Sequence, residues 1–238
     1  MVEVEIIQPW SDVLMKTKLP DEVLNGVIEI TDQVLQNPDR EDWGKFLHGQ
    51  IEEEPLIPHQ MMMDYTLDDG GSVFSWLMNC IEDYVKFCVK QTCLPAEYDK
   101  IKDTTAMEWL TKMRSCWAVS QWEGEYNPIH IHTNCDISTV MYLKVPEFLP
   151  SIKPNLDHDG SIMFVGRAGP TTHLNRNEIK WKPNVGDFFI FPAHMMHCVY
   201  PFKTEGRQER RSVSFNADFV SRQQLDLEEF EYVRVENK

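Results

Sequence analysis

The chain has 238 residues, and its 42% hydrophobic and 11% aromatic residues are typical of a globular protein, which excludes a disordered or fibrous chain. Its 23 Lys and Arg against 38 Asp and Glu give a formal net charge of −15. Such a charge disfavours binding to the phosphate backbone of a nucleic acid.

The first half of the chain predicts a mixture of elements. Alternating charged and apolar residues favour a strand at 4–7. Apolar residues at helical spacing predict a helix over Asp21–Gln36, which ends before Asn37-Pro38. A second apolar stripe predicts a helix over 73–88, with Ser72 as its cap. The segment 44–58 between them is expected to be strand and loop.

The second half is rich in β-branched and aromatic residues. Short runs of strand character are separated by turns rich in Pro, Gly and Asn, and the longest connections cover 146–160 and 166–186. Many short strands with such turns predict a β-sandwich or barrel. The predicted strands are 117–121, 137–145, 161–165, 187–191, 197–200 and 211–219.

These elements predict a mainly β protein with flanking helices. We expect a single domain over 1–238, in which 1–115 is a helical flank, 116–220 is the β core and 221–238 is a C-terminal extension. No run of 18 apolar residues indicates a membrane span, and the acidic first residues lack a secretory signal pattern. Six scattered cysteines without a Cys-x-x-Cys pair indicate reduced thiols and hence a cytoplasmic location.

Histidines are concentrated in the predicted β half. His130 and His132 lie two residues apart before a strand, so an extended backbone places both imidazoles on one side, where they can bind one metal ion. A further histidine on a distant β segment is needed to complete a metal site. His197 is the candidate, because it lies within the apolar segment 196–200, and His194 at the preceding strand end is its rival.

The last predicted strand carries polar residues on one face. Strand alternation places Arg210, Ser212, Ser214 and Asn216 together, whereas Arg211 points to the opposite face. A buried guanidinium needs an anion, and a carboxylate held by two hydrogen bonds is the natural ligand. The residues leave open whether Arg210 or Arg211 is the buried one.

Taken in order, these motifs resemble the Fe(II)/2-oxoglutarate-dependent oxygenases, and are most similar to a prolyl-4-hydroxylase-like branch of bacterial and marine phage proteins. The resemblance spans about residues 117–219 and implies a double-stranded β-helix, a jelly roll of the cupin-like kind. The stretches that carry it are Trp117-Ala118-Val119, Asn127 to His132, Ser138 to Leu143, Gly186 to Pro192, His197 to Phe202 and Arg210 to Asn216.

The resemblance also implies roles for single residues. His130 and His197 match the family's two iron-binding histidines, and Arg210 matches the residue that anchors the distal carboxylate of 2-oxoglutarate. Further residues implied around the 2-oxoglutarate pocket are Tyr142, Ser212, Ser214, Asn127 and Asn216.

One position departs from the family pattern. Most members have His-x-Asp before the strand, giving two histidines and one carboxylate as ligands, but this chain has His132 in the place of the Asp. Three arrangements follow: His132 binds the metal, Asp136 reaches in from the following loop, or the position has no protein ligand. We favour His132, which makes His130, His132, His197 and Arg210 the expected catalytic set.

The resemblance implies an enzyme that uses Fe(2+), 2-oxoglutarate and O2, with ascorbate as an optional addition. It hydroxylates a C–H bond of a prolyl or other side chain, or of a small molecule, and releases succinate and CO2. A phage-encoded protein of this kind would work in the host cytoplasm. Basic residues in the two long connections raise the hypothesis of an acidic or anionic substrate; they are Lys153, Arg167, Arg176, Lys180 and Lys182.

Two other classes of protein remain open. A three-histidine dioxygenase of the cupin-like kind would use no keto acid, and it would leave Arg210 without a carboxylate to bind. A non-catalytic jelly roll would act as a binding module and hold no stoichiometric metal.

Overall fold

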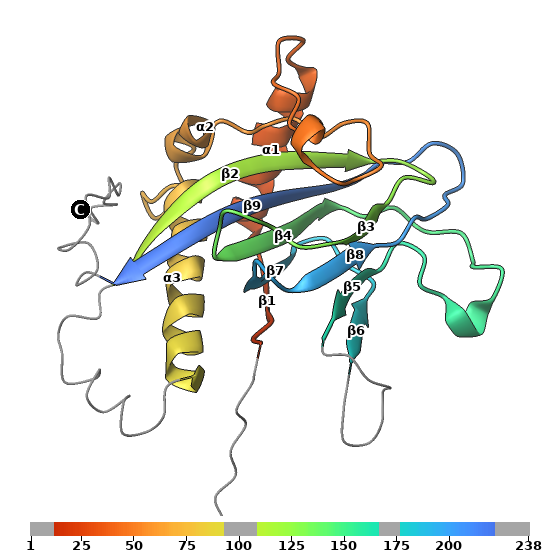
Figure 1. Cartoon of the computed structure of the whole chain (residues 1–238). Helices are drawn as coiled ribbons and strands as arrows, with labels where there is room; N and C mark the ends of the chain where they lie inside the picture. The colour runs from red at the N-terminus through yellow and green to blue at the C-terminus, as the bar shows by residue number, and fades with distance from the viewer. Residues whose placement is uncertain (1–11, 93–108, 167–176, 222–238) are drawn as a thin grey trace, which may run out of the picture.

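Two antiparallel β-sheets face each other in the computed structural model, which describes residues 12–92, 109–166 and 177–221 (Figure 1). The larger sheet has the order β1 (Met15–Lys18), β7 (Asp187–Pro192), β4 (Ile137–Lys144), β9 (Arg210–Ser221) and β2 (Trp109–Gln121). The smaller sheet has the order β3 (Asn127–His130), β8 (Met196–Val199), β5 (Ile162–Val165) and β6 (Glu178–Trp181).

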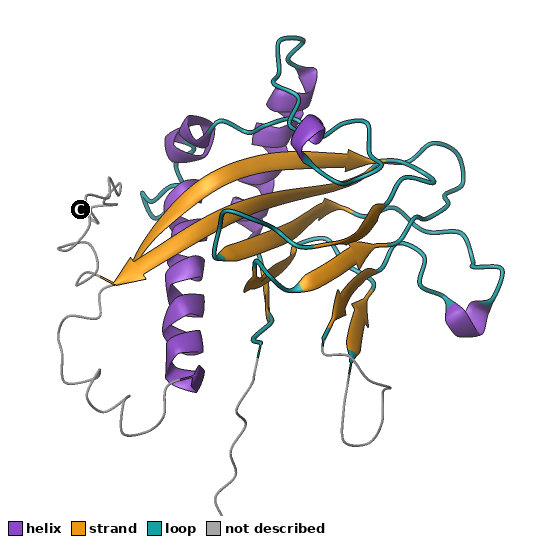
Figure 2. Cartoon of the chain, in the orientation of Figure 1, coloured by secondary structure: helices purple, strands orange, loops and turns teal. Residues whose placement is uncertain are grey.

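Helices cover the outer face of the larger sheet (Figure 2). They are α1 (Asp21–Gln36), α2 (His59–Asp64) and α3 (Val73–Thr92), with short 3-10 turns η1 (Gly44–Phe46) and η2 (Pro154–Leu156). No helix in the part of the chain described above is both long and apolar enough to cross a membrane.

The apolar stripes predicted for α1 and α3 are buried against the sheet. Val27 on α1 and Leu77 on α3 are both fully buried, and burying one such side chain contributes about 1.5–3 kcal/mol. The bounds predicted for α1 are confirmed. The Ser72 cap of α3 is confirmed as well, because its Oγ accepts a hydrogen bond from the Ser75 amide at 3.1 Å.

Strand alternation divides the larger sheet into two faces. On β7, Phe188 and Ile190 pack in the core shared with the helices, whereas Phe189 and Phe191 pack in a second core with the smaller sheet. Both faces of β7 are therefore apolar, as expected for a strand buried on both sides. Polar side chains on the inner face of β9 consequently lie between the two sheets.

Several elements differ from those predicted. Strand β6 lies inside 166–186, which was expected to be a connection, and β2 begins at Trp109 rather than at 117. Strand β1 and helix α2 were not predicted. These elements are short or depend on distant partners: β2 reaches its full length by pairing with β9 along its whole course. The strand predicted at 4–7 lies outside the described residues.

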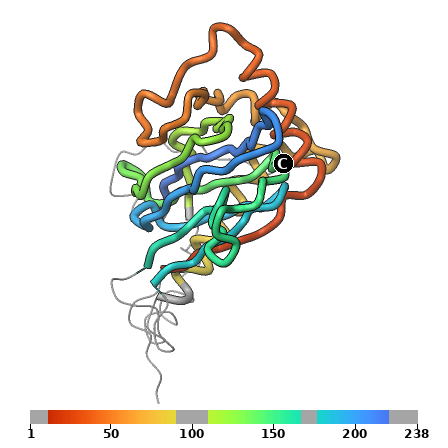
Figure 3. The backbone as a smooth tube through the Cα atoms, turned by 90° about the vertical axis from the view of Figure 1, so that its right-hand side faces the viewer, coloured from red at the N-terminus to blue at the C-terminus, as the bar shows by residue number. Residues whose placement is uncertain are grey.

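The segment between α1 and α2 runs along the free edge of β2. The amides of Ala118 and Ser120 donate to the carbonyls of Pro55 and Glu53, each at 2.9 Å. In Figure 3 this segment, drawn in orange, lies above the green and blue strands. The segment predicted as strand and loop thus extends one edge of the sheet and closes over the space between the sheets.

Candidate active site

A cavity of about 510 Å³ opens between the two sheets. Strands of both sheets and the segment beside β2 contribute to its wall, and its volume is in the range of small-molecule sites. Four histidines, three serines, Arg210 and Tyr142 are among the polar residues of the wall.

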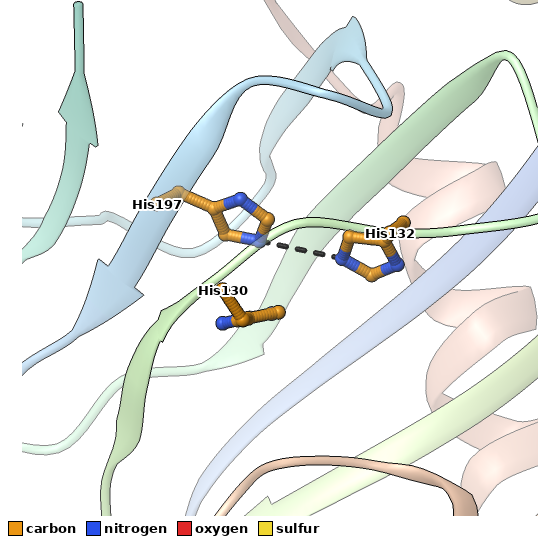
Figure 4. A group of neighbouring side chains, drawn as sticks. All are labelled: His130, His132 and His197. Atoms are coloured by element: carbon orange, nitrogen blue, oxygen red, sulfur yellow. Dashed lines mark hydrogen bonds between the residues drawn. The ribbon is translucent and has the colours of Figure 1, made fainter.

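His130, His132 and His197 converge in this cavity (Figure 4). Strand pairing causes part of this, because His130 on β3 and His197 on β8 are register partners. One ring nitrogen from each residue lies within 4.8 Å of the other two. The Nε2 atoms of His132 and His197 approach to 3.3 Å, as the dashed line in Figure 4 shows.

Backbone carbonyls orient two of these rings. His130 Nδ1 donates to the Pro128 carbonyl at 2.7 Å, and His197 Nδ1 donates to the Met195 carbonyl at 2.9 Å. With the proton on Nδ1, the Nε2 lone pair is available to a metal ion; a metal-binding histidine usually donates its other ring N–H in this way.

The three imidazoles are neutral at physiological pH. Burial is the main cause: it lowers the pKa of His130, and together with the neighbouring imidazoles it lowers the pKa of His132 and of His197 to about 3. Neutral nitrogens can bind a cation without first losing a proton. The residues present therefore fit a divalent metal ion.

The rival ligands considered above lie elsewhere. His194 has a side chain that is 71% exposed and contacts Asp12 at 3.2 Å. Asp136 accepts a hydrogen bond from the Phe219 amide at 3.2 Å through Oδ2 and is absent from the cavity wall. Only the three-histidine arrangement brings ligand atoms together among the described residues.

Arg210 is buried in the same cavity without an acidic partner in the part of the chain described. Its guanidinium donates to the Gly160 carbonyl at 2.6 Å and to Gln121 Oε1, while its Nε has no hydrogen-bond partner. Its side chain lies beside Tyr142, with 5.8 Å between the guanidinium carbon and the ring centroid. A buried cation with a free donor needs an anion to compensate its charge.

Tyr142 offers a second free donor. Its hydroxyl is buried and has no hydrogen-bond partner. Burial raises its pKa to about 12, although the nearby Arg210 opposes this shift, so the phenol keeps its proton. A carboxylate between the two side chains would accept hydrogen bonds from both.

The other residues predicted for the cofactor pocket all line the cavity. Ser212, Ser214 and Asn216 follow Arg210 on the same face of β9, and Asn127 faces them from β3. Asn216 lies beside His132 and partly opposes the fall in its pKa. The buried Asn216 Oδ1 has no hydrogen-bond partner among the described residues.

Arg211 points to the opposite face of β9. It forms ion pairs with Glu209 at 2.6 Å and with Asp32 of α1. Of the two arginines left open by the sequence, the structure therefore places Arg210, and not Arg211, in the cavity.

Sequence reasoning missed the contribution of the first half of the chain to this cavity. Trp43, Phe46, His48 and Glu54 all line it. Glu54 is 2% exposed, and burial, helped by the charges of Glu125 and Asp42, raises its pKa to about 7. No local motif signals this residue, since it is the third of three consecutive glutamates.

The raised pKa of Glu54 predicts a pH-dependent stability. The folded protein binds the proton more tightly than the unfolded chain does, so stability is lost as pH rises from the ordinary value of 4.5 to about 7. Glu54→Gln removes this loss. We expect the variant to gain free energy of unfolding over the wild type as pH rises from 5 to 8, approaching about 3 kcal/mol. Urea denaturation at several pH values measures it; a constant difference would contradict the prediction.

Comparison with known proteins identifies the class of this fold and site. Residues 115–216 match the family model described as putative 2OG-Fe(II) oxygenase. The matched segment includes His130, His132, His197 and Arg210, and it makes the chain similar to the non-haem iron oxygenases of the 2OG-Fe(II) class, which use Fe(2+), 2-oxoglutarate and O2. No curated protein matches the chain.

Solved structures share the fold. A prolyl-4-hydroxylase from Pseudomonas putida is 14% identical, with a TM-score of 0.50 over 88% of this chain and 92% of that one. A prolyl hydroxylase from Trichoplax adhaerens, in complex with a fragment of hypoxia inducible factor, is 12% identical, with a TM-score of 0.53 over 91% of this chain and 86% of that one. The predicted double-stranded β-helix and the prolyl-hydroxylase-like resemblance are confirmed; the phage source stays a prediction.

Proposed function

We propose that His130, His132 and His197 hold Fe(II) and that Arg210 and Tyr142 hold the distal carboxylate of 2-oxoglutarate. The observation that supports this assignment best is the shared cavity: free donors on Arg210 and Tyr142 face the same space as three neutral imidazoles. When bound, the iron and the keto acid supply the oxidising chemistry, in which 2-oxoglutarate is converted to succinate and CO2.

The chain's own residues orient and enclose the reactants. Backbone carbonyls hold the Nδ1 protons of His130 and His197, so both rings keep their direction whether or not a metal is present. The guanidinium of Arg210 is itself held by Gln121 and Gly160, which fixes the direction from which it meets a carboxylate.

Apolar side chains close the inner part of the cavity. Val140, Ile162, Phe191 and Val199 line it between the sheets. They exclude water from the reacting groups, which strengthens the electrostatic contacts made inside. The substrate supplies the C–H bond to be hydroxylated, on a prolyl or other side chain of a peptide or on a small molecule.

Product analysis tests this function. The iron-loaded protein is incubated with 2-oxoglutarate, O2 and ascorbate, and succinate is measured by mass spectrometry. We expect succinate to form only when both iron and 2-oxoglutarate are present, at a low rate before a substrate is supplied.

One observation favours a second candidate, a three-histidine dioxygenase that uses no keto acid: three imidazoles, without a carboxylate, form the cluster. The same assay separates the two functions. Oxygen consumption that does not depend on 2-oxoglutarate would support the second candidate and contradict the first.

A further inference from the structure

Glu54 is the only carboxylate that lines the cavity among the described residues. Its side chain is 2% exposed, and its buried Oε2 has no hydrogen-bond partner. It is not one of the ligand atoms gathered around the histidine cluster. The proposed reaction gives this group no role, although a buried carboxylate without a partner is energetically costly.

The backbone holds Glu54 in this position from two sides. The Trp43 amide donates to its carbonyl at 3.0 Å, and its neighbours Glu53 and Pro55 pair with β2. A Cβ built on Gly49 would lie 3.3 Å from Glu54 Oε2 and would clash with Asn127 Oδ1. The oxygens of Glu54 and Asn127, two residues that both line the cavity, therefore lie on the same side of Gly49.

No cation of the cavity wall compensates Glu54. Arg114 lines the cavity but pairs with Asp218. Arg210 donates to neutral groups, Gly160 and Gln121, and no ion pair joins it to Glu54. Within the described part of the wall, the Glu54 carboxyl group thus has no ionic partner, and a cationic ligand would stabilise its deprotonated form.

Aromatic side chains of the same segment flank this point. Trp43 and Phe46 both line the cavity, and their ring centroids are 4.8 Å apart. Phe46 is 61% exposed. The Lys45 ammonium lies over the Phe46 ring, 5.0 Å from its centroid, so this ring already takes part in a cation–π contact, as an organic cation on an apolar stem could.

Two of the basic residues that suggested an anionic substrate form ion pairs, whereas Lys153 is exposed on its connection. Lys180 pairs with Glu178 at 2.6 Å, and Lys182 pairs with Asp157. Arg167 and Arg176 lie outside the described residues. Among the described residues, Glu54 is thus the acidic group of the cavity wall that is left without an ionic partner.

We propose that Glu54, together with the Asn127 carboxamide, binds an ammonium or guanidinium group of the substrate. This inference rests on the proposed function, since it assigns a substrate class to the same cavity. The substrate would carry its cation on a stem that passes Trp43 and Phe46, as a lysyl or arginyl side chain does.

Four probes test this proposal on the protein loaded with Mn(II) and 2-oxoglutarate. They are the Nα-acetyl amides of arginine, lysine, citrulline and Nε-acetyl-lysine. Citrulline matches arginine closely in shape without its charge, and Nε-acetyl-lysine is a neutral, larger form of lysine. Calorimetric titration gives the dissociation constants. We expect one charged probe to bind about tenfold or more tightly than its analogue, because charge-assisted hydrogen bonds are about twice as strong as neutral ones.

Two variants locate the effect. Glu54→Gln keeps the shape of the side chain and is expected to remove the preference for the charged probe. Glu52→Gln removes the same charge from an exposed residue of the same segment, and it should keep the preference. Equal binding of charged and neutral probes, no binding of any probe at millimolar concentration, or an unchanged preference in Glu54→Gln would each overturn the proposal.

Titrations of the metal-free protein separate this inference from the proposed function. If iron and 2-oxoglutarate prove inactive while the charged probe still binds through Glu54, the function fails and the subsite stands. If succinate forms but no charge preference is found, the subsite fails and the function stands.

Discussion

Replacing His197 by alanine is expected to abolish stoichiometric iron binding. His197 is 5% exposed, and its Nε2 faces His132 at 3.3 Å, so its loss leaves two ligands instead of three. Loss of a group that merely hydrogen-bonds a metal ligand weakens metal binding by about 10–100-fold, and loss of a ligand should cost more. Metal analysis after reconstitution and Ni(II) titration by calorimetry measure the loss, with circular dichroism to confirm folding.

His194→Ala is the matched control for this variant. It removes an imidazole three residues away whose side chain is 71% exposed, and we expect its metal affinity to stay within about twofold of the wild type, as is usual for an exposed surface change. If His194→Ala loses iron while His197→Ala retains it, the ligand assignment is wrong.

The third ligand needs its own comparison. His132→Ala is expected to weaken iron binding strongly, whereas Asp136→Asn is not, because Asp136 Oδ2 already accepts a hydrogen bond from the Phe219 amide. His132→Asp would place the carboxylate found in most of the family at this position and is expected to keep iron bound. Loss of iron in Asp136→Asn would instead show that this residue reaches the metal.

The part of the site that could be predicted from sequence depends on strand alternation. Ile129 and Ile131 are exposed on β3 and just beyond it, and His130 and His132 consequently point inward. The same rule places Arg211 on the opposite face of β9 once Arg210 is known to face the cavity. Strand alternation involves neighbouring residues only, so it can be predicted from a single sequence.

Glu54 shows why the rest of the site could not be predicted. Its direction is set by the pairing of Glu53 with Ser120, which lies far away along the chain. Nothing in the local pattern distinguishes Glu54 from Glu52 and Glu53. Strand β6 was missed for a related reason: its four residues form a strand by pairing with β5, which lies before it in the chain.

Arg210→Ala is expected to raise the 2-oxoglutarate concentration needed for half-maximal succinate formation by at least 30-fold. Truncating one partner of a buried charge pair costs about 2–5 kcal/mol, and each 1.4 kcal/mol is a factor of ten. The guanidinium is fully enclosed, and its free Nε and the free Tyr142 hydroxyl have no other acceptor in the described residues. Initial rates at increasing 2-oxoglutarate concentration measure the effect.

Arg211→Ala distinguishes recognition of the keto acid from support of the fold. Arg211 joins β9 to α1 through Asp32 and also pairs with Glu209, so its loss should lower the melting temperature while the 2-oxoglutarate requirement stays near that of the wild type. Tyr142→Phe removes only a hydroxyl and should raise the requirement by a smaller factor than Arg210→Ala does. Of these two arginines, only Arg210 faces the cavity. If both arginine variants raise the 2-oxoglutarate requirement equally, a general loss of stability explains both results, and the keto acid does not bind at Arg210.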